Sequence, residues 1–313
     1  MSKNIRIALD GVADDYRESL IPILIESLGY KITWSNTNSA ELIIIGPFYD
    51  PRNKNRWIPR PLRKFYTESV EIIQTGNNAI TLFQTGENLR HNHFEANYSI
   101  SFDHCPEFKN NYRFPYWMEL IDWSSEGVTG NINPRFGKLL SIERLMRPLG
   151  KKFLTKPRAA AIFASHLREP RRTIINAVRQ HAKVEGFGPA FDSKIIHHSK
   201  SSFTKSAVLE NFSFNLCPEN SLYPGYYTEK MPEAFMADCL PITWADVNIP
   251  LDFNPNALIN LSPMVKENFE SLGELLQSNK KLNEFSEQPL LLIRPTITPL
   301  KEFIGEILRQ AKS

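Results

Sequence analysis

The feature that most constrains the fold of this sequence is residues 214–246, where a strand, a polar loop, a helix and a second strand follow one another directly. Residues 212–217 alternate apolar and polar side chains, which is typical of a strand. A loop with two prolines and a glycine comes next, and Thr228 is a good N-cap for a helix. Residues 240–244 then predict another strand, so the stretch indicates a β-loop-α-β unit.

The polar side chains of this unit gather between the end of its first strand and the start of its helix. They are Glu219, Asn220, Tyr226, Glu229 and Lys230. Open α/β sheets bind ligands at the carboxyl ends of their strands, and a helix N-terminus favours an anion. The unit therefore predicts an anion-binding site, and the alternative is an ordinary crossover with a capped helix.

Composition favours a globular protein of about two domains. The chain has 313 residues, of which 42% are hydrophobic and 23% charged, and its formal net charge is only +3. That small charge argues against nucleic acid as a partner. No apolar run approaches the roughly 20 residues of a membrane span, and the N-terminus lacks a signal-peptide pattern. The three cysteines have neither disulfide-framework nor metal-ligand spacing, so we expect a reducing cytoplasm.

Strand and helix patterns divide the chain into two α/β halves. The first half shows the order β-α-β-β with near-continuous apolar strands, which is typical of a sheet covered on both faces. A basic stretch with little strand character separates it from the second half. We therefore predict an N-terminal domain at 1–152, a C-terminal domain at 153–297 and a packed amphipathic helix at 298–313. The expected strands are 5–9, 31–34, 42–45, 79–84, 98–102, 159–164, 212–217, 240–244 and 257–261.

Two cations are candidates for binding an anionic ligand. The sequence has neither a GxGxxG nor a Walker phosphate loop, and no Asp-x-Asp pair for a metal on a diphosphate. The pyrophosphate of a nucleotide sugar would therefore be neutralised by side chains and backbone dipoles. Lys230 lies at an expected helix N-terminus, where the dipole disfavours a cation, and Arg172 lies near the start of another expected helix. The alternative for each is a solvated surface cation.

Glu87 is the candidate general base. It follows an expected strand and a flexible Thr-Gly pair, so its carboxylate can accept a proton from an acceptor hydroxyl. The alternative is an ordinary loop glutamate. Three histidines and a cysteine between residues 91 and 105 have irregular spacing, and we predict no metal site there.

Taken together, these motifs resemble the signature of the α1,3/α1,4-fucosyltransferases, glycosyltransferase family ten. Phe-Asn-Leu-Cys-Pro-Glu-Asn-Ser at 214–221, Gly-Tyr-Tyr-Thr-Glu-Lys at 225–230 and Leu-Pro-Ile-Thr-Trp-Ala at 240–245 carry the resemblance in the family's order. Weaker matches are Phe-Ala-Ser at 163–165 with Arg172, Thr-Gly-Glu-Asn at 85–88, Ile-Ser-Phe-Asp at 100–103, Arg-Phe-Pro at 113–115 and Asp-Phe-Asn-Pro at 252–255.

The resemblance implies the α/β fold class GT-B, in which two Rossmann-like domains face each other across a cleft. GDP-fucose is then expected in the C-terminal domain and the acceptor glycan against the N-terminal one. The implied reaction is an inverting transfer of L-fucose to a glycan hydroxyl, α1,3 or α1,4 on an acceptor that contains N-acetylglucosamine. In that reaction Glu87 is the general base, while Arg172 and Lys230 contact the diphosphate. The other implied donor-site residues are Glu219, Asn220, Tyr226 and Glu229, the last on the nucleoside or fucose hydroxyls.

The resemblance also implies the partners of the protein. They are GDP-fucose as the donor substrate and an oligosaccharide or lipid-linked glycan, such as a lipopolysaccharide precursor, as the acceptor. No cofactor is strictly required, and a divalent cation is at most a stimulant. We expect a cytoplasmic enzyme with peripheral contact to the inner face of the membrane.

Two departures from the family pattern keep other functions open. Pro218 replaces the usual aromatic residue before Glu-Asn, and Ala245-Asp246 replaces the usual glycine after the tryptophan. Both can change the shape of the donor pocket. The alternatives are a GT-B transferase with another nucleotide sugar, and a non-catalytic protein that binds a nucleotide or a glycan. The N-terminal half matches only in short pieces, so it does not identify the acceptor.

Overall fold

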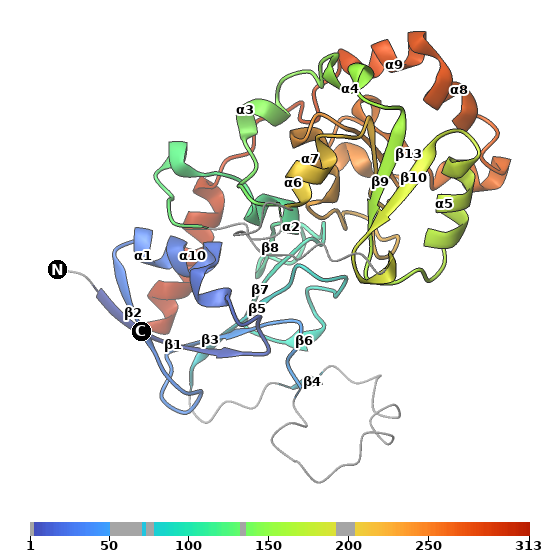
Figure 1. Cartoon of the computed structure of the whole chain (residues 1–313). Coiled ribbons are helices and arrows are strands. Elements are labelled where there is room, and N and C mark those ends of the chain that lie inside the picture. The colour runs from blue at the N-terminus through green and yellow to red at the C-terminus, as the bar shows by residue number, and fades with distance from the viewer. Residues whose placement is uncertain (1–2, 51–70, 73–77, 132–135, 192–203) are drawn as a thin grey trace. The chain divides into compact units, whose positions relative to one another are not determined.

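A computed structural model describes residues 3–50, 71–72, 78–131, 136–191 and 204–313 of the chain. It divides the chain into two compact α/β units (Figure 1). Unit 1 is formed from Met1–Glu119, Trp123–Asn131 and Thr296–Ser313, and unit 2 from Leu120–Asp122 and Ile132–Pro295. Each unit is built on its own parallel sheet, as the β-α-β patterns of the sequence predict.

The sheet of unit 1 has six strands in the order β2-β1-β3-β5-β7-β8, and every neighbouring pair is parallel. Its central strands are apolar throughout: all four residues of the β3 sequence Leu-Ile-Ile-Ile are buried. The strands are β1 (Lys3–Asp10), β2 (Tyr30–Trp34), β3 (Leu42–Ile45), β5 (Ile80–Gln84), β7 (Tyr98–Ser101) and β8 (Asn111–Arg113). A separate two-stranded sheet pairs β4 (Glu71–Ile72) with β6 (Phe94–Glu95).

Two longer helices belong to unit 1. Helix α1 (Leu20–Ser27) buries Leu20, Ile21, Leu24 and Ile25, which recur at helical spacing on one face. Helix α10 (Thr298–Ala311) has a proline in its first turn and lies beside α1 (Figure 1). Its buried residues are Leu300, Ile304, Ile307 and Leu308. The short helices are η1 (Tyr16–Glu18), α2 (Tyr116–Glu119) and η4 (Ser124–Glu126).

The sheet of unit 2 has five parallel strands in the order β10-β9-β11-β12-β13. They are β9 (Ala159–Phe163), β10 (Lys183–Phe187), β11 (Phe214–Leu216), β12 (Leu240–Thr243) and β13 (Ile259–Asn260). Strand β9 leads to β10 on one side, whereas β11 continues the sheet on the other side. The strand order therefore reverses between β9 and β11, and such a switch point is where open α/β sheets bind ligands.

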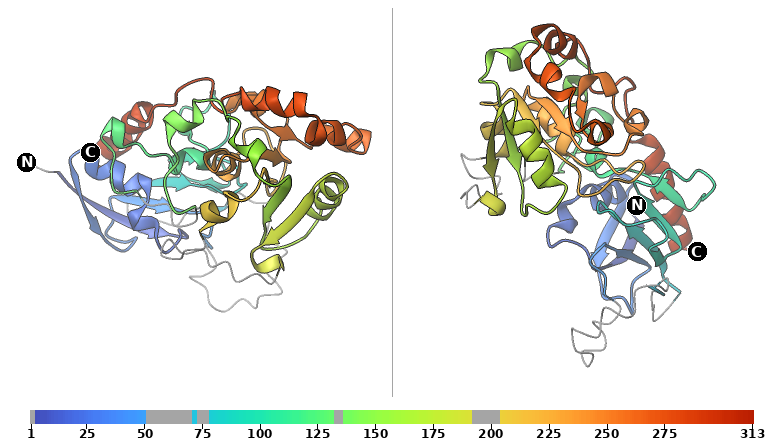
Figure 2. Two further views of the ribbon diagram at one scale, coloured as in Figure 1. Left: turned by 45° about the horizontal axis from the view of Figure 1, so that its top comes forward. Right: turned by 90° about the vertical axis from the view of Figure 1, so that its right-hand side faces the viewer.

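Helices cover the sheet of unit 2. Helix α5 (Arg171–Arg179) packs against β10, and α7 (Lys230–Met236) packs against β12 and α6 (Lys205–Leu209). Helices α8 (Leu272–Gln277) and α9 (Asn279–Ser286) pack on each other (Figure 2). The remaining short helices are α3 (Ile142–Leu145), α4 (Lys152–Thr155), η5 (Pro189–Phe191), η6 (Ile249–Leu251), η7 (Pro255–Ala257) and η8 (Pro263–Glu267).

The continuous part of unit 2 begins at Ile132, which is earlier in the chain than the domain boundary expected after residue 152. Residues 136–152 have little strand character, but their apolar side chains Phe136, Leu140 and Leu145 are completely buried within unit 2. In the last helix, Phe303 contacts the rings of Tyr98 and Tyr112 at 5.8 and 5.4 Å between centroids, so α10 belongs to unit 1. The packing of apolar side chains thus goes with the assignment of residues 136–152 to unit 2 and of α10 to unit 1, which strand pattern alone does not indicate.

Candidate functional site

The loops that follow the two strands at the switch point of unit 2 hold the donor-site residues suggested by the sequence. The loop after β9 leads to α5, whose first two residues are Arg171 and Arg172. The loop after β11 carries Glu219, Asn220, Tyr226 and Glu229 and leads to α7, whose first residue is Lys230. Because β9 and β11 are paired in parallel, these two loops leave the sheet at the same edge.

Glu219 is the centre of the loop after β11. It is 1% exposed, and its carboxylate accepts the backbone N–H of Thr228 at 2.8 Å. The Thr228 hydroxyl contacts both carboxylate oxygens, at 2.9 and 3.1 Å. The Nζ of Lys230 lies 2.7 Å from the second oxygen and 2.9 Å from the Thr228 hydroxyl. Because this carboxylate is buried and both of its oxygens accept hydrogen bonds, it orients the ammonium of Lys230 beside it.

Lys230 carries the charge that an anion would meet. Burial opposes its ionisation, but the carboxylates of Glu219 and Glu229 outweigh burial and raise the pKa of this ammonium well above its ordinary value. The Lys230 side chain is 20% exposed, whereas the Glu219 side chain is not exposed. The partner carboxylate is therefore hidden, whereas part of the Lys230 side chain remains exposed.

The predicted N-cap of α7 is wrong. The helix begins at Lys230 and its N-cap residue is Glu229; the hydroxyl of Thr228 donates to Glu219 and accepts from the Nζ of Lys230. Helix α7 is also only seven residues long, so its dipole is small. Side-chain cations, rather than the helix N-terminus, are therefore the main attraction for an anion here.

The two arginines at the start of α5 differ in their surroundings. Arg172, which the sequence motif suggests, is exposed, whereas Arg171 is 8% exposed. The guanidinium of Arg171 donates to the Oδ1 of Asn220 at 2.7 Å and to the backbone oxygen of His166 at 3.2 Å. Arg171 thus joins the loop after β9 to the loop after β11. Sequence reasoning missed it because two adjacent arginines cannot be told apart without their helix phase.

The other two predicted donor-site residues are buried in the same loop. Tyr226 is 2% exposed and Glu229 is 8% exposed. Asn220, in contrast, is an exposed residue that reaches Arg171. The structure thus gathers the residues predicted for the donor site in two neighbouring loops of unit 2, with Arg172 on the outer side of its helix turn.

A buried ion pair joins α6 to α7, the helix that begins with Lys230, and the sequence motifs did not reveal it. Lys205 on α6 pairs with Glu233 on α7, whose side chain has no exposed surface. Burial raises the pKa of Glu233 to about 7, although Lys205 acts to lower it. The field of Glu233 and Glu229 raises the pKa of Lys205 against its own burial. The pair joins α6 to the helix that begins with Lys230.

Glu87, the predicted general base, belongs to unit 1. It lies in the loop after β5, and its side chain is exposed. Its backbone N–H donates to the hydroxyl of Thr85 at 3.0 Å, and the hydroxyl of Thr85 contacts the backbone oxygen of Glu87 at 3.2 Å. The backbone of Glu87 is therefore fixed while its carboxylate reaches solvent.

A second carboxylate lies near the same strand end and was missed from the sequence. The Nε2 of Gln84, the last residue of β5, donates to Glu119 at 2.9 Å, and Tyr16 donates to the other end of the Gln84 amide. Burial raises the pKa of Glu119 to about 7. This chain of three polar side chains joins η1, β5 and α2 at the carboxyl edge of the unit 1 sheet.

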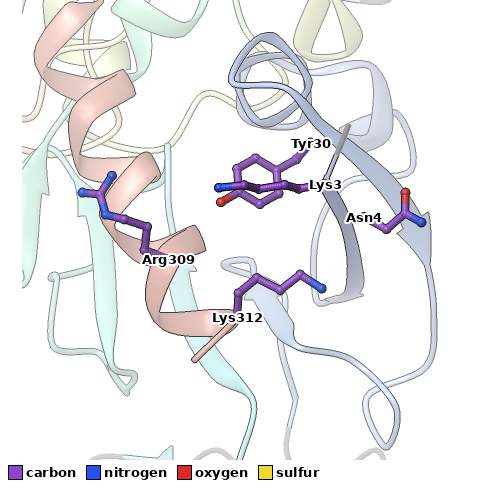
Figure 3. A pocket seen from close by; sticks show the side chains of 5 residues that line it. All are labelled: Lys3, Asn4, Tyr30, Arg309 and Lys312. Carbon is purple, nitrogen blue, oxygen red and sulfur yellow. The ribbon is translucent and has the colours of Figure 1, made fainter. Parts of the chain in front are cut away.

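A shallow basic concavity of about 460 Å³ lies elsewhere in unit 1 (Figure 3). Lys3 extends along the ring of Tyr30, and Arg309 and Lys312 come from α10. Lys312 pairs with Glu41 at 2.8 Å and Arg309 with Glu306 at 2.6 Å, so acidic side chains of the protein compensate both cations. None of the predicted site residues lines this concavity.

The three cysteines are free thiols. Among the residues that the structure describes, no group of three or more His, Cys, Asp or Glu side chains could hold a metal ion. In the same described part of the chain, no helix is both long and apolar enough to cross a membrane.

Comparison with known proteins decides the family. The model of the C-terminal part of glycosyltransferase family 10 (fucosyltransferase) matches residues 153–288. Residues 153–288 of the chain therefore form a family 10 domain. Both switch-point loops of unit 2 lie inside the matched residues, so they are part of the family 10 domain. The family that the sequence motifs suggest is confirmed.

A curated fucosyltransferase and solved fucosyltransferase structures are similar to this chain. The α-(1,3)-fucosyltransferase FucT of Helicobacter pylori is 27% identical over 244 residues, which are 71% of this chain and 50% of that protein. The chain thus spans half the length of that relative. A crystal structure of an α1,3-fucosyltransferase matches 98% of this chain and 90% of its own, with a TM-score of 0.68 and 22% identity. A crystal structure of α1,3-fucosyltransferase with GDP-fucose matches with the same TM-score and 21% identity. The predicted GT-B fold class is therefore confirmed.

Proposed function

We propose that this family 10 protein is a fucosyltransferase that moves L-fucose from GDP-fucose to a hydroxyl of a glycan. We propose GDP-fucose as the donor because of the fucosyltransferase family match and because the fold is similar to a fucosyltransferase structure with GDP-fucose. The acceptor that we propose contains N-acetylglucosamine, is an oligosaccharide or a lipid-linked glycan, and is fucosylated at an α1,3 or α1,4 position. The transfer inverts the configuration of the fucose C1.

The observation that carries this proposal is the accessible cation at the switch point of unit 2. Lys230 is oriented by the hidden carboxylate of Glu219, 2.7 Å away, and keeps 20% of its side chain exposed. Arg171 and Arg172 start the helix after the neighbouring strand β9. A diphosphate needs such cations, because each one stabilises its negative charge through charge-assisted hydrogen bonds.

The leaving group of the proposed reaction is GDP, which gains negative charge on its diphosphate as the bond to C1 of fucose breaks. Lys230 and Arg172 are the groups that we propose to stabilise this charge. Glu229, Asn220 and Tyr226 are proposed to contact the rest of the donor. Removal of one such electrostatic contact typically costs about 2.7–4 kcal/mol of transition-state stabilisation.

The acceptor hydroxyl must lose a proton as its oxygen attacks C1. Glu87 is our proposed general base, because its carboxylate reaches solvent on a loop whose backbone is fixed by Thr85. A carboxylate within hydrogen-bond reach of the attacking hydroxyl accelerates such a step about 10²–10⁴-fold. Direct displacement by one oxygen at C1 gives the inverted product.

Thermal denaturation with GDP, UDP or CMP added tests the donor. We expect GDP to raise the melting temperature, since a ligand that binds only the folded state stabilises it by mass action. UDP and CMP are expected to have little effect. Stabilisation by UDP and not by GDP would favour a transferase with another nucleotide sugar, and no response to any nucleotide would favour a glycan-binding protein.

A further inference from the structure

We propose that Asp103 and Arg90 are positioning residues that clasp the loop of Glu87, and so hold the general base in its working place. The inference rests on the proposed function, because it assigns a role to groups around the proposed base. Neither residue is proposed to touch the substrate.

The topology of unit 1 brings the clasp together. Glu87 follows β5 and Asp103 follows β7, and these strands are parallel neighbours with Gln84 opposite Ile100. The backbone N–H of Thr85 still donates to the oxygen of Ile100 at 3.1 Å, so the pairing extends to the first residue of the loop. Segments sixteen residues apart in sequence therefore leave the sheet side by side.

Asp103 is the fixed part of the clasp. It is 4% exposed, and one carboxylate oxygen accepts the backbone N–H of His91 at 2.6 Å and contacts its ring Nδ1 at 3.0 Å. The other oxygen accepts from the guanidinium of Arg90 at 3.1 Å. A buried carboxylate needs hydrogen-bond donors around it, and Arg90 and the backbone N–H of His91 are two, with the His91 ring as a third contact. All three groups come from the loop that contains Glu87.

Arg90 transmits this hold toward Glu87. One branch of its guanidinium binds Asp103, while the other donates to the side-chain oxygen of Asn88, the residue next to Glu87. The guanidinium also lies 4.4 Å from the centre of the Phe102 ring. A planar fork held on both branches and one face has little freedom to turn. Asn88 is therefore tied to the adjacent strand end.

The other side of Glu87 is held by Thr85. Its hydroxyl accepts the N–H of Glu87 at 3.0 Å, and Thr85 itself is 2% exposed. Glu87 thus lies between two anchors, Thr85 on one side and the Asn88–Arg90–Asp103 chain on the other. The side chain of Glu87 is exposed, and it is the part that a base needs to move onto a hydroxyl.

The consequence is a rate effect without a donor-binding effect. A base misplaced by about 1 Å costs on the order of 100-fold in rate. Donor binding belongs to the loops of unit 2 and does not depend on this clasp. Loss of the clasp should therefore lower kcat and leave the KM for GDP-fucose within about twofold of wild type.

The experiment measures kcat and both KM values for Asp103→Asn, Arg90→Met and Arg90→Lys. Asp103→Asn keeps the size of the side chain but replaces a carboxylate oxygen by an NH₂ group, which cannot accept from Arg90 or from the N–H of His91. We expect kcat to fall at least about tenfold. Arg90→Lys keeps a positive charge beside Asp103 but lacks the second guanidinium branch that reaches Asn88. Its kcat should therefore lie between those of Arg90→Met and wild type. Glu41→Gln is the matched control in unit 1, because Glu41 pairs with Arg6 and Lys312 and is remote from the loop in sequence. It should leave kcat unchanged.

A double variant separates positioning from general support of the fold. If the clasp acts through Glu87, adding Asp103→Asn to Glu87→Gln should cost little further activity, whereas an independent role would give multiplied losses. Assays run at a temperature at which the circular dichroism of each variant equals that of wild type. Wild-type kcat in Asp103→Asn and Arg90→Met, with Glu87→Gln inactive, would overturn the clasp and leave the proposed function standing. Wild-type kcat in Glu87→Gln would overturn the base and the clasp together.

Discussion

The carboxylate of Glu219 lies 2.7 Å from the ammonium of Lys230 and accepts the backbone N–H of Thr228 at 2.8 Å. One buried side chain thus fixes both the cation and the turn that precedes α7. The carboxylate has no exposed surface, so we propose that it acts on the donor through Lys230.

Glu219→Gln should weaken both the fold and the donor site. Removal of one partner from a largely buried pair typically costs about 3 kcal/mol, because the other charge loses its main compensation. We expect a lower urea midpoint and weaker GDP binding in calorimetry. Glu306→Gln, on an exposed pair with Arg309, is the control and should change neither. An unchanged urea midpoint in Glu219→Gln would contradict the central place of this carboxylate.

Arg171→Met and Arg172→Met should separate structure from binding. Arg171 is buried and donates to Asn220, so its loss should lower the free energy of unfolding by about 1.5–3 kcal/mol and weaken GDP binding. Arg172 is exposed, so its loss should weaken GDP binding with little change in stability. Urea unfolding and GDP titration measure the two effects. Equal stability losses in both variants would show that the helix phase described for α5 is wrong.

A large part of the proposed donor site can be predicted because its residues are contiguous. Strand β11, the loop and α7 follow one another within residues 214–236, so local patterns are enough to place Glu229 and Lys230. Most strands of both sheets can be predicted for the same reason, although β8 and β10 are not among the expected strands: an apolar run such as that of β3 indicates a buried strand. The family motifs then supplied the roles that periodicity cannot supply.

Residues that meet only in the folded chain could not be predicted. Asp103 reaches the Glu87 loop because β5 and β7 are neighbours, and strand order does not follow from strand pattern. The pair of Lys205 and Glu233 joins two helices in the same way. The predicted N-cap of α7 was wrong because the hydroxyl of Thr228 bonds to Glu219 and Lys230 and not to the backbone of the helix. The bond to Glu219 joins residues nine positions apart, so local sequence patterns do not reveal it.

Removal of divalent metal should leave activity in place. The proposed site neutralises a diphosphate with Lys230 and the arginines of α5, which are available without a metal ion. Transfer from GDP-fucose measured in excess chelator is expected to keep most of its rate, and added magnesium or manganese should change it only modestly. Complete loss in chelator, restored by one of these metals, would contradict neutralisation by side chains.

The unfolding free energy should depend on pH through Glu119. Its pKa is about 7 in the folded chain against an ordinary 4.5, because burial disfavours the charged form. The unfolded chain thus releases this proton at lower pH, so stability falls as pH rises from about 4.5 to about 7 and then levels off. The change is at most about 3 kcal/mol.

Glu119→Gln tests this dependence, because an amide does not titrate. Urea unfolding at pH 5 and pH 8 should show a smaller fall in stability for the variant than for wild type. Glu233, whose pKa is also about 7, should supply part of the fall that remains. An equal fall in both proteins would mean that Glu119 ionises normally in the folded chain.

Transfer of fucose from GDP-fucose to a galactose/N-acetylglucosamine disaccharide is the direct assay of the proposed activity. Release of GDP and the mass of the product are measured for wild type and for Lys230→Met. We predict a product heavier by one fucose, GDP release that depends on the acceptor, and a loss of at least about 100-fold in turnover for Lys230→Met. Wild-type turnover in Lys230→Met, or transfer from a uridine-linked sugar in place of GDP-fucose, would contradict the account.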